Sequence, residues 1–288
     1  MQKQCLMLMG LVVVGLMIVP MSAANAAWIE LDNFESRDLG NLEGQGGWVD
    51  NLTSTTLWVV QDDPTNPGNN QIARFTQVDK GMAKVPVSIP DQTTSTIFYR
   101  MQLASSTSGT WRIGVGEDFT GAASTWAGQF ANFEAYVQNT SGASTPNQLQ
   151  AIRGIPSISL VNLSASISRQ TWYNFWQVLD NDNKTYDVFI QGGTFALPTQ
   201  IGTAIPFRGE GGIGNLTTFY ILDNSGSSVA ANQLYFDDLY QASGVNLTNP
   251  TIVPEPNAFL LSSFWFTGLM YCRRKYSRSV AMTIKVRG

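Results

Sequence analysis

Three carboxylates near the start of the chain have the types and the close spacing that acid–base chemistry on a sugar requires. Glu30, Asp32 and Glu35 follow the pattern E-x-D-x-x-E. Hydrolysis of a glycosidic bond with retention uses two carboxyl groups about 5–5.5 Å apart. In a regular strand Glu30 and Asp32 share one face, so a bulge is needed to bring Glu35 to the same side. We keep these residues as an alternative catalytic set and expect a protein without catalytic activity.

A second pair of carboxylates predicts a structural calcium ion that ties the two ends of the domain together. Strand alternation places Glu35 and Asp238 on otherwise apolar faces, shared with Ile29, Leu31, Leu234, Phe236 and Tyr240. A carboxylate on such a face is costly unless it is paired or bound to a metal. Hard oxygen ligands suit calcium. Pairing with an arginine or a backbone N–H is the alternative, and the prediction requires the first and last strands to be neighbours.

Trp111 and Trp126 are the candidate ligand-binding aromatic residues. They flank the polar segment 117–125, and an exposed indole ring can bury the apolar face of a sugar. Aromatic residues at a period of two are more often part of a core, which is the alternative for both.

The composition excludes several other chemistries. The chain has no histidine, and its two cysteines, Cys5 and Cys272, lie in apolar segments at the ends. Histidine-based catalytic systems and cysteine-based zinc sites are therefore excluded from the middle of the chain. Residues 27–253 hold 20 acidic and 10 basic side chains, a net charge of −10. This acidity argues against nucleic acid and, unless a cation bridges, against direct binding of anionic polymers.

The elements that must position these residues are short strands. Residues 172–179 alternate two sets of side chains, and turn-forming clusters such as DDPTNPGNN and NTSGASTPN separate a dozen such runs. This pattern predicts a β-sandwich over residues 27–241. The predicted strands are Thr56–Val60, Gln71–Phe75, Ala83–Ile89, Thr96–Leu103, Thr110–Gly116, Phe130–Val137, Gln148–Ile152, Ser157–Leu163, Trp172–Leu179, Tyr186–Ile190, Phe219–Leu222 and Gln233–Tyr240.

Both ends of the chain are predicted to be sorting segments. Residues 1–26 combine Lys3, an uncharged apolar run from Leu6 to Val19 and the sequence Ala24-Asn25-Ala26. These are the parts of a secretory signal, cut by signal peptidase after Ala26; the apolar run is short for an N-terminal membrane anchor. Residues 242–252 read as a polar stalk. The uncharged stretch from Pro256 to Cys272 is long enough for a transmembrane helix. The basic cluster after it predicts that the C-terminal end of this helix lies in the cytoplasm.

The C-terminal segment, residues 253–275, resembles the PEP-CTERM sorting signal of Gram-negative bacteria. It has the motif Val253-Pro254-Glu255-Pro256, then the apolar helix, then Arg273-Arg274-Lys275. The resemblance implies an inner-membrane intermediate, recognition by an exosortase, and transfer to the outer cell surface or extracellular matrix. Residues 276–288 extend past the usual end of such a signal, and we expect them to form a cytoplasmic tail.

The body resembles a concanavalin A-like, laminin-G-type jelly roll. The resemblance lies in LDNFESRDLGNLEGQGGW at its start, WYNFWQVLDNDNKTYDVFIQGG, and QLYFDDLYQ at its end. The opening and closing stretches also resemble galactose-binding-like modules, which remain an alternative. Laminarinase-like glycosidases on the first fold carry a signature similar to residues 30–35.

These observations predict an exported, non-catalytic surface or matrix protein, with an extracellular polysaccharide as the hypothetical ligand. A glycoside hydrolase or lyase of the laminarinase-like type that uses Glu30, Asp32 and Glu35 is one alternative. A purely structural surface protein with no ligand is the other. Fold alone does not decide among the three, because one fold hosts many functions.

Overall fold

The computed structural model describes residues 26–50, 58–76, 81–103, 111–117, 133–139, 148–154, 158–209, 214–223 and 234–251. By its internal contacts the chain divides into two units, residues 1–248 and 249–288. In the second unit only residues 249–251 are described, where Thr251 donates to the Asn249 side chain. The stretches 1–25 and 252–288, including the predicted signal, Val253, Pro254, Glu255, Pro256, Arg273, Arg274 and Lys275, lie outside the described residues. No helix in the described ranges is long and apolar enough to cross a membrane.

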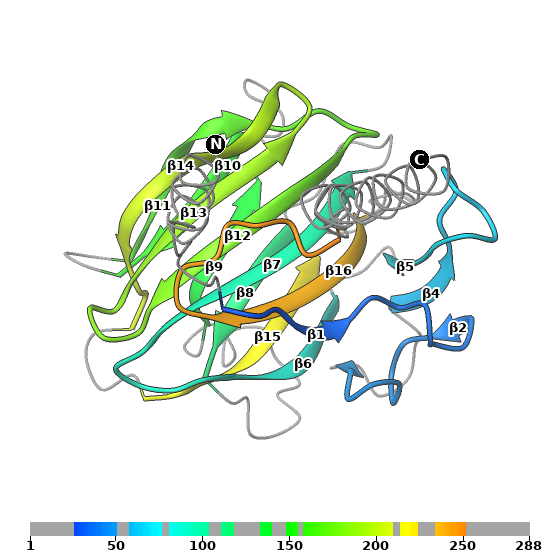
Figure 1. The fold of residues 1–288 in the computed structure, drawn as a ribbon, viewed down its shortest axis with the longest axis horizontal. Coiled ribbons are helices and arrows are strands. Elements are labelled where there is room, and N and C mark those ends of the chain that lie inside the picture. The colour runs from blue at the N-terminus through cyan, green and yellow to red at the C-terminus, as the bar shows by residue number, and fades with distance from the viewer. Residues whose placement is uncertain are drawn as a thin grey trace, which may run out of the picture. The chain divides into compact units, whose positions relative to one another are not determined.

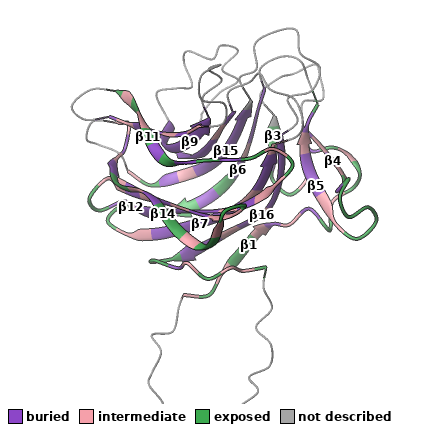
Figure 2. Cartoon of the chain, turned by 90° about the horizontal axis from the view of Figure 1, so that it is seen from above, coloured by how far each residue is buried: buried purple, intermediate pink, exposed green. Residues whose placement is uncertain are grey.

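The described part of the first unit is an all-β sandwich of two antiparallel sheets (Figures 1 and 2). One sheet has nine strands, in the order β14 (Phe195–Pro206), β13 (Thr185–Gly192), β12 (Trp172–Asp180), β7 (Thr94–Leu103), β16 (Leu234–Ser243), β5 (Gln71–Phe75), β4 (Trp58–Asp62) and β2 (Gly40–Asn41), with β1 (Ile29–Asp32) also pairing with β16. The other has seven, in the order β11 (Ser159–Ser166), β10 (Gln148–Arg153), β9 (Phe133–Asn139), β8 (Trp111–Gly116), β15 (Leu216–Asp223), β6 (Gly81–Ile89) and β3 (Val49–Asp50). The predicted β-sandwich is confirmed.

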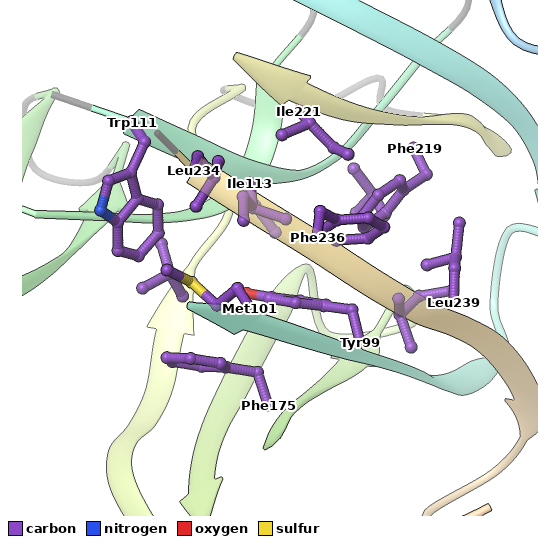
Figure 3. Close-up of a cluster of buried hydrophobic side chains, with 14 of the residues drawn as sticks. Tyr99, Met101, Trp111, Ile113, Phe175, Phe219, Ile221, Leu234, Phe236 and Leu239 are labelled. Carbon is purple, nitrogen blue, oxygen red and sulfur yellow. The ribbon is translucent and has the colours of Figure 1, made fainter. Parts of the chain in front are cut away.

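The core lies between the sheets because alternate residues of each strand point inward. On β12, Tyr173, Phe175 and Leu179 join the main hydrophobic cluster, and the rings of Phe175 and Tyr99 stack with centroids 5.3 Å apart (Figure 3). Gln177 is the polar residue on this inward face. Its amide nitrogen donates to the Tyr99 hydroxyl and to the Ile113 carbonyl, each at 3.1 Å, which satisfies two buried acceptors.

The first and last strands are neighbours, as predicted. Ile29 pairs with Gln241 and Glu30 with Tyr240 in an antiparallel ladder, and Figure 1 shows β1 beside β16. The predicted stalk, however, starts too early. β16 runs to Ser243. Asn246 is 1% exposed, and its side chain donates to the Ala26 carbonyl (2.7 Å) and accepts from the Thr248 N–H. Residues 242–248 therefore belong to the sandwich, fixed by side chains that alternation does not reveal.

Candidate functional site

The three carboxylates of the E-x-D-x-x-E pattern each contact a different partner. Glu30 is exposed and accepts a hydrogen bond from the Tyr240 hydroxyl at 2.9 Å. Glu35 is also exposed and accepts from the backbone N–H of Gln71 at 2.9 Å. The strand register shifts between Glu30 and Asp32, so the expectation that these two share a face is wrong.

Asp32 is a buried structural residue. Its carboxylate accepts hydrogen bonds from Trp48 Nε1 (2.7 Å), from the backbone N–H of Phe34 (2.8 Å) and from Arg37 Nε (3.1 Å). These contacts fix the turn that follows β1 and occupy both carboxylate oxygens. Asp32 therefore serves to hold this turn in place.

Asp238 likewise has a protein partner. Its Oδ2 lies 2.6 Å from Arg100 Nη1, whereas Glu35 is bound to Gln71. The predicted face is wrong, because Asp238 has a positive φ of 55° and the register shifts between Asp237 and Tyr240. This irregularity directs Phe236 and Leu239 into the core, while Tyr240 contacts Phe98 outside it. Across the described ranges, no three Cys, Asp or Glu side chains gather into a group that could hold a metal ion. The calcium ion at Glu35 and Asp238 therefore remains a prediction from sequence that this structure does not test.

Trp111 belongs to the core, so its assignment as a ligand-binding residue is wrong. It is 3% exposed and belongs to the main cluster, as do Ile113 and Val115 at the other inward positions of β8. Figure 3 shows Trp111 and Ile113 among the buried side chains of this cluster. The period of two on this strand was the correct signal. Trp126 lies outside the described residues.

A row of polar side chains crosses the outer face of the seven-stranded sheet. Strand register places Arg112, Gln138, Gln150 and Asn162 side by side on β8, β9, β10 and β11. Arg112 Nε donates to Gln138 Oε1 (2.8 Å), Gln138 Nε2 to Gln150 Oε1 (3.1 Å), and Gln150 Nε2 to Asn162 Oδ1 (2.8 Å). We call this chain the amide ladder. With strands spaced about 4.8 Å apart, it is roughly 14 Å long.

The amide ladder is ordered and reaches the surface. Gln138 is 4% exposed, Gln150 and Arg112 are half-buried and Asn162 is exposed. Each glutamine amide nitrogen uses one of its two hydrogens within the ladder and keeps one for another acceptor. Because each residue of the ladder donates one hydrogen bond to the next residue, the side chains hold one another in place.

Apolar and aromatic groups flank the ladder. Arg112 lies over the Tyr136 ring, with Cζ 5.6 Å from its centroid. Tyr136 belongs to a small outer cluster with Met82, Phe133, Ile152, Tyr220 and Leu222. Burial raises the pKa of the Tyr136 hydroxyl, and Arg112 and Arg208 oppose this. Leu160, on β11 next to Ile152, is 45% exposed.

Two carboxylates on the same side of the sheet bind main-chain groups. Glu134, 3% exposed, accepts a 2.6 Å hydrogen bond from the Gly209 N–H, and Glu117 accepts one of 3.0 Å from the Gly214 N–H. Burial raises the pKa of Glu134, the charge of Glu117 adds to this, and Arg208 opposes it. These contacts anchor residues 209 and 214 to β8 and β9.

A pocket of about 380 Å³ lies farther along the same sheet. It is lined by Gly47, Val49, Lys84, Val85, Pro86, Val87, Thr217 and Thr218, from β3, β6 and β15 and the turn before β3. Lys84 is half-buried, and the hydroxyl of Thr217 is buried with no hydrogen-bond partner among the described residues. Sequence reasoning missed this pocket and the ladder. The outward polar positions of FEAYVQN and QLQAIR were the available signal, but they do not reveal which strands pair.

No family model and no curated protein matches this chain. Among solved structures, it is similar to a peanut lectin in complex with a nine-residue peptide, at 10% identity and a TM-score of 0.49, covering 78% of this chain and 100% of that one. It is also similar to Cip1, a cellulose-induced protein, at 13% identity and a TM-score of 0.47, covering 75% and 99%. A third is the catalytic domain of a GH131 beta-glucanase from Podospora anserina, at 14% identity and a TM-score of 0.42, covering 68% and 82%.

Proposed function

We propose that this chain is an exported, non-catalytic bacterial surface or matrix protein that binds a polysaccharide on the outer face of β8–β11. The observation that carries the proposal is the amide ladder from Arg112 to Asn162. It is a preformed row of hydrogen-bonding groups that ends at an exposed strand.

Amide side chains suit the hydroxyl groups of a sugar. A hydroxyl both donates and accepts, and an amide presents donors and an acceptor in one plane. Gln150 retains a free amide hydrogen, and Asn162 Nδ2 has no hydrogen-bond partner in the described residues. The exposed aliphatic side chain of Leu160 lies beside them and supplies an apolar contact for ring C–H groups. Preorganised side chains lose little entropy when a ligand binds.

The sorting part of the proposal rests on sequence. A signal cut by signal peptidase after Ala26, and an exosortase-recognised tail with Val253-Pro254-Glu255-Pro256, deliver the sandwich to the cell exterior. Extracellular polysaccharide is the polymer that such a protein meets there.

The test compares two amide-to-alanine variants of the full-length protein in detergent micelles. Gln150→Ala removes both ladder bonds of that residue. Asn174→Ala is the matched control, because Asn174 is half-buried on β12 of the other sheet and donates to Gln191 at 3.4 Å. Binding to immobilised neutral and acidic polysaccharides is measured by interferometry. We expect Gln150→Ala to weaken binding about tenfold, as for the loss of one or two hydrogen bonds, and Asn174→Ala to have no effect.

Two results would contradict the proposal. Wild-type protein that binds no polysaccharide would favour a purely structural role. Polysaccharide that becomes shorter during incubation, measured by its elution volume, would favour a hydrolase or lyase.

A further inference from the structure

We infer that the edge strand β11 is a pairing surface for a second copy of this chain, in antiparallel register about a two-fold axis at Leu160. The inference goes beyond the proposed function and does not depend on it. It rests on the free edge of β11, on the lack of charge around that edge, and on two exposed aliphatic side chains there, Ile158 and Leu160.

The free edge lies at the start of β11. This strand ends the seven-stranded sheet and, among the described strands, pairs only with β10. The pairing is regular from Ser159 to Asn162. Beyond Asn162 the register shifts, and Ser164 lies close enough to β14 to donate to the Ile201 carbonyl at 3.4 Å. Residues 158–162 therefore form a short edge whose outward backbone N–H and C=O groups can pair with another strand.

The strands at the other ends of the two sheets carry features that discourage such pairing. β2 and β3 have two residues each, too few to serve as a template for another strand. β14 contains Pro198 and Pro206, and its register shifts three times against β13. Shortness, proline, irregular register and charged side chains are the usual protections of an edge strand. β11 has eight residues and contains neither a proline nor a charged side chain, so it is the least protected of the four.

The surroundings of this edge carry little charge, although the body of the protein is acidic. Residues 27–253 have a net charge of −10, so two copies repel each other wherever their carboxylates face. β10, β11 and β14 contact one another along one side of the sandwich (Figure 1), and together they contain one charged residue, Arg153. A second copy can therefore approach these strands without bringing carboxylates on them together.

The exposed side chains of the edge suit a two-fold axis. Ile158 and Leu160 are 58% and 45% exposed, and Leu160 is the midpoint of residues 158–162. In an antiparallel pair centred there, Leu160 lies opposite its own copy and Ile158 lies opposite Asn162 of the second copy. Side chains directly opposite each other have Cβ atoms about 4.5–5.5 Å apart, so the two leucine side chains shield each other from water. Such a pair joins two amide ladders, each ending at Asn162, in one continuous sheet.

Opposite charges introduced at Leu160 test this pairing in the full-length protein in detergent micelles. Analytical ultracentrifugation, with the detergent matched in density, measures the dissociation constant of the dimer. We expect the wild type to dimerise reversibly. Leu160→Lys and Leu160→Asp should each weaken the dimer at least about tenfold, because like charges then lie opposite each other. An equimolar mixture of the two variants should restore the dimer, because the charges that face each other are then opposite in sign.

Leu197→Lys is the matched control. Leu197 is 72% exposed on β14, so the variant adds the same charge to the same side of the sandwich but away from the proposed axis. It should leave the dissociation constant unchanged. Because Leu160 and Leu197 are both exposed, the melting temperatures of all three variants should stay close to that of the wild type. This measurement separates loss of pairing from loss of folding.

A wild-type protein that stays monomeric would overturn the inference. A dimer that persists in both Leu160 variants would do the same, because another segment would then hold it together. If the mixture fails to restore the dimer, or if Leu197→Lys weakens it as much as Leu160→Lys does, the Leu160 side chains do not lie opposite each other and the inference falls. A wild-type dimer that binds no polysaccharide would leave this interface standing while the proposed function falls.

Discussion

Replacement of Asp237 by asparagine should change how the stability of this protein depends on pH. Asp237 lies on β16 with no exposed surface, and Asn70 Nδ2 donates to its Oδ2 at 3.1 Å. Burial, with the charge of Asp238 as the second cause, raises the pKa of Asp237 from 3.8 to about 8, against the opposing effects of Asn70 and Arg100. The folded protein therefore keeps a proton that the unfolded chain releases.

The sign and size follow from proton linkage. Between pH 4 and pH 8 the folded state binds one more proton than the unfolded state, so the free energy of unfolding falls as pH rises. The contribution is fully present below the unfolded pKa of 3.8 and is lost as pH rises through about 8. For one proton, the loss between pH 5.5 and 7.5 is roughly 3 kcal/mol. An asparagine side chain cannot ionise. The free energy of unfolding of Asp237→Asn should therefore rise relative to that of the wild type by this amount over the interval.

Urea unfolding of the full-length protein, followed by tryptophan fluorescence at pH 5.5, 6.5 and 7.5, measures the effect. The chain has no histidine, so no side chain with an ordinary pKa titrates in this window. Glu134 and Asp238, whose pKa values are also raised, act in the same direction and remain in the variant. Asp62→Asn, an exposed aspartate on β4, is the control and should keep the wild-type slope. Equal slopes for wild type and Asp237→Asn would refute the reasoning.

Two further variants test the structural roles of individual polar residues. Asp32→Ala should lower the free energy of unfolding by about 3–5 kcal/mol, because it leaves Trp48 Nε1 and Arg37 without their buried carboxylate. The control Glu30→Ala should lower it by less than about 1 kcal/mol. Polysaccharide binding by the folded fraction of Asp32→Ala should not change, and a selective loss of binding would show that Asp32 belongs to a functional site. Asn246→Ala should cost about 2 kcal/mol in urea unfolding, since it removes the bonds to the Ala26 carbonyl and to Thr248; an unchanged midpoint and slope would show that this contact between the two ends contributes nothing.

Strand positions were predictable wherever inward side chains alternate. The predicted strand Gln71–Phe75 matches β5, and the predicted strand Trp172–Leu179 differs from β12 by one residue. Burial of one face requires a period of two, and that period is visible in the sequence. β14 was missed because its sequence, FALPTQIGTAIP, has two prolines and largely exposed side chains, as an edge strand permits.

The faces of β1 and β16 could not be predicted. The register shift after Glu30 and the positive φ of Asp238 each reset the alternation, so Asp32 and Asp238 do not point where a regular strand would direct them. A non-glycine residue at positive φ is held there by the surrounding structure, which strand periodicity does not encode.

The amide ladder could not be predicted from the sequence for a related reason. Alternation places Gln138 and Gln150 outward on strands that were correctly predicted, but the ladder exists only because β8, β9, β10 and β11 are paired in one register. Cross-strand register is set by turns and by the complete core.

Hydrogen exchange with and without bound polysaccharide tests the central claim most directly. We predict slower exchange for peptides that span β10 and β11, residues 148–166, and no change for peptides that span β12 and β13, residues 172–192. Protection confined to residues 29–41, which contain Glu30, Asp32 and Glu35, would contradict this account, as would protection confined to residues 172–192.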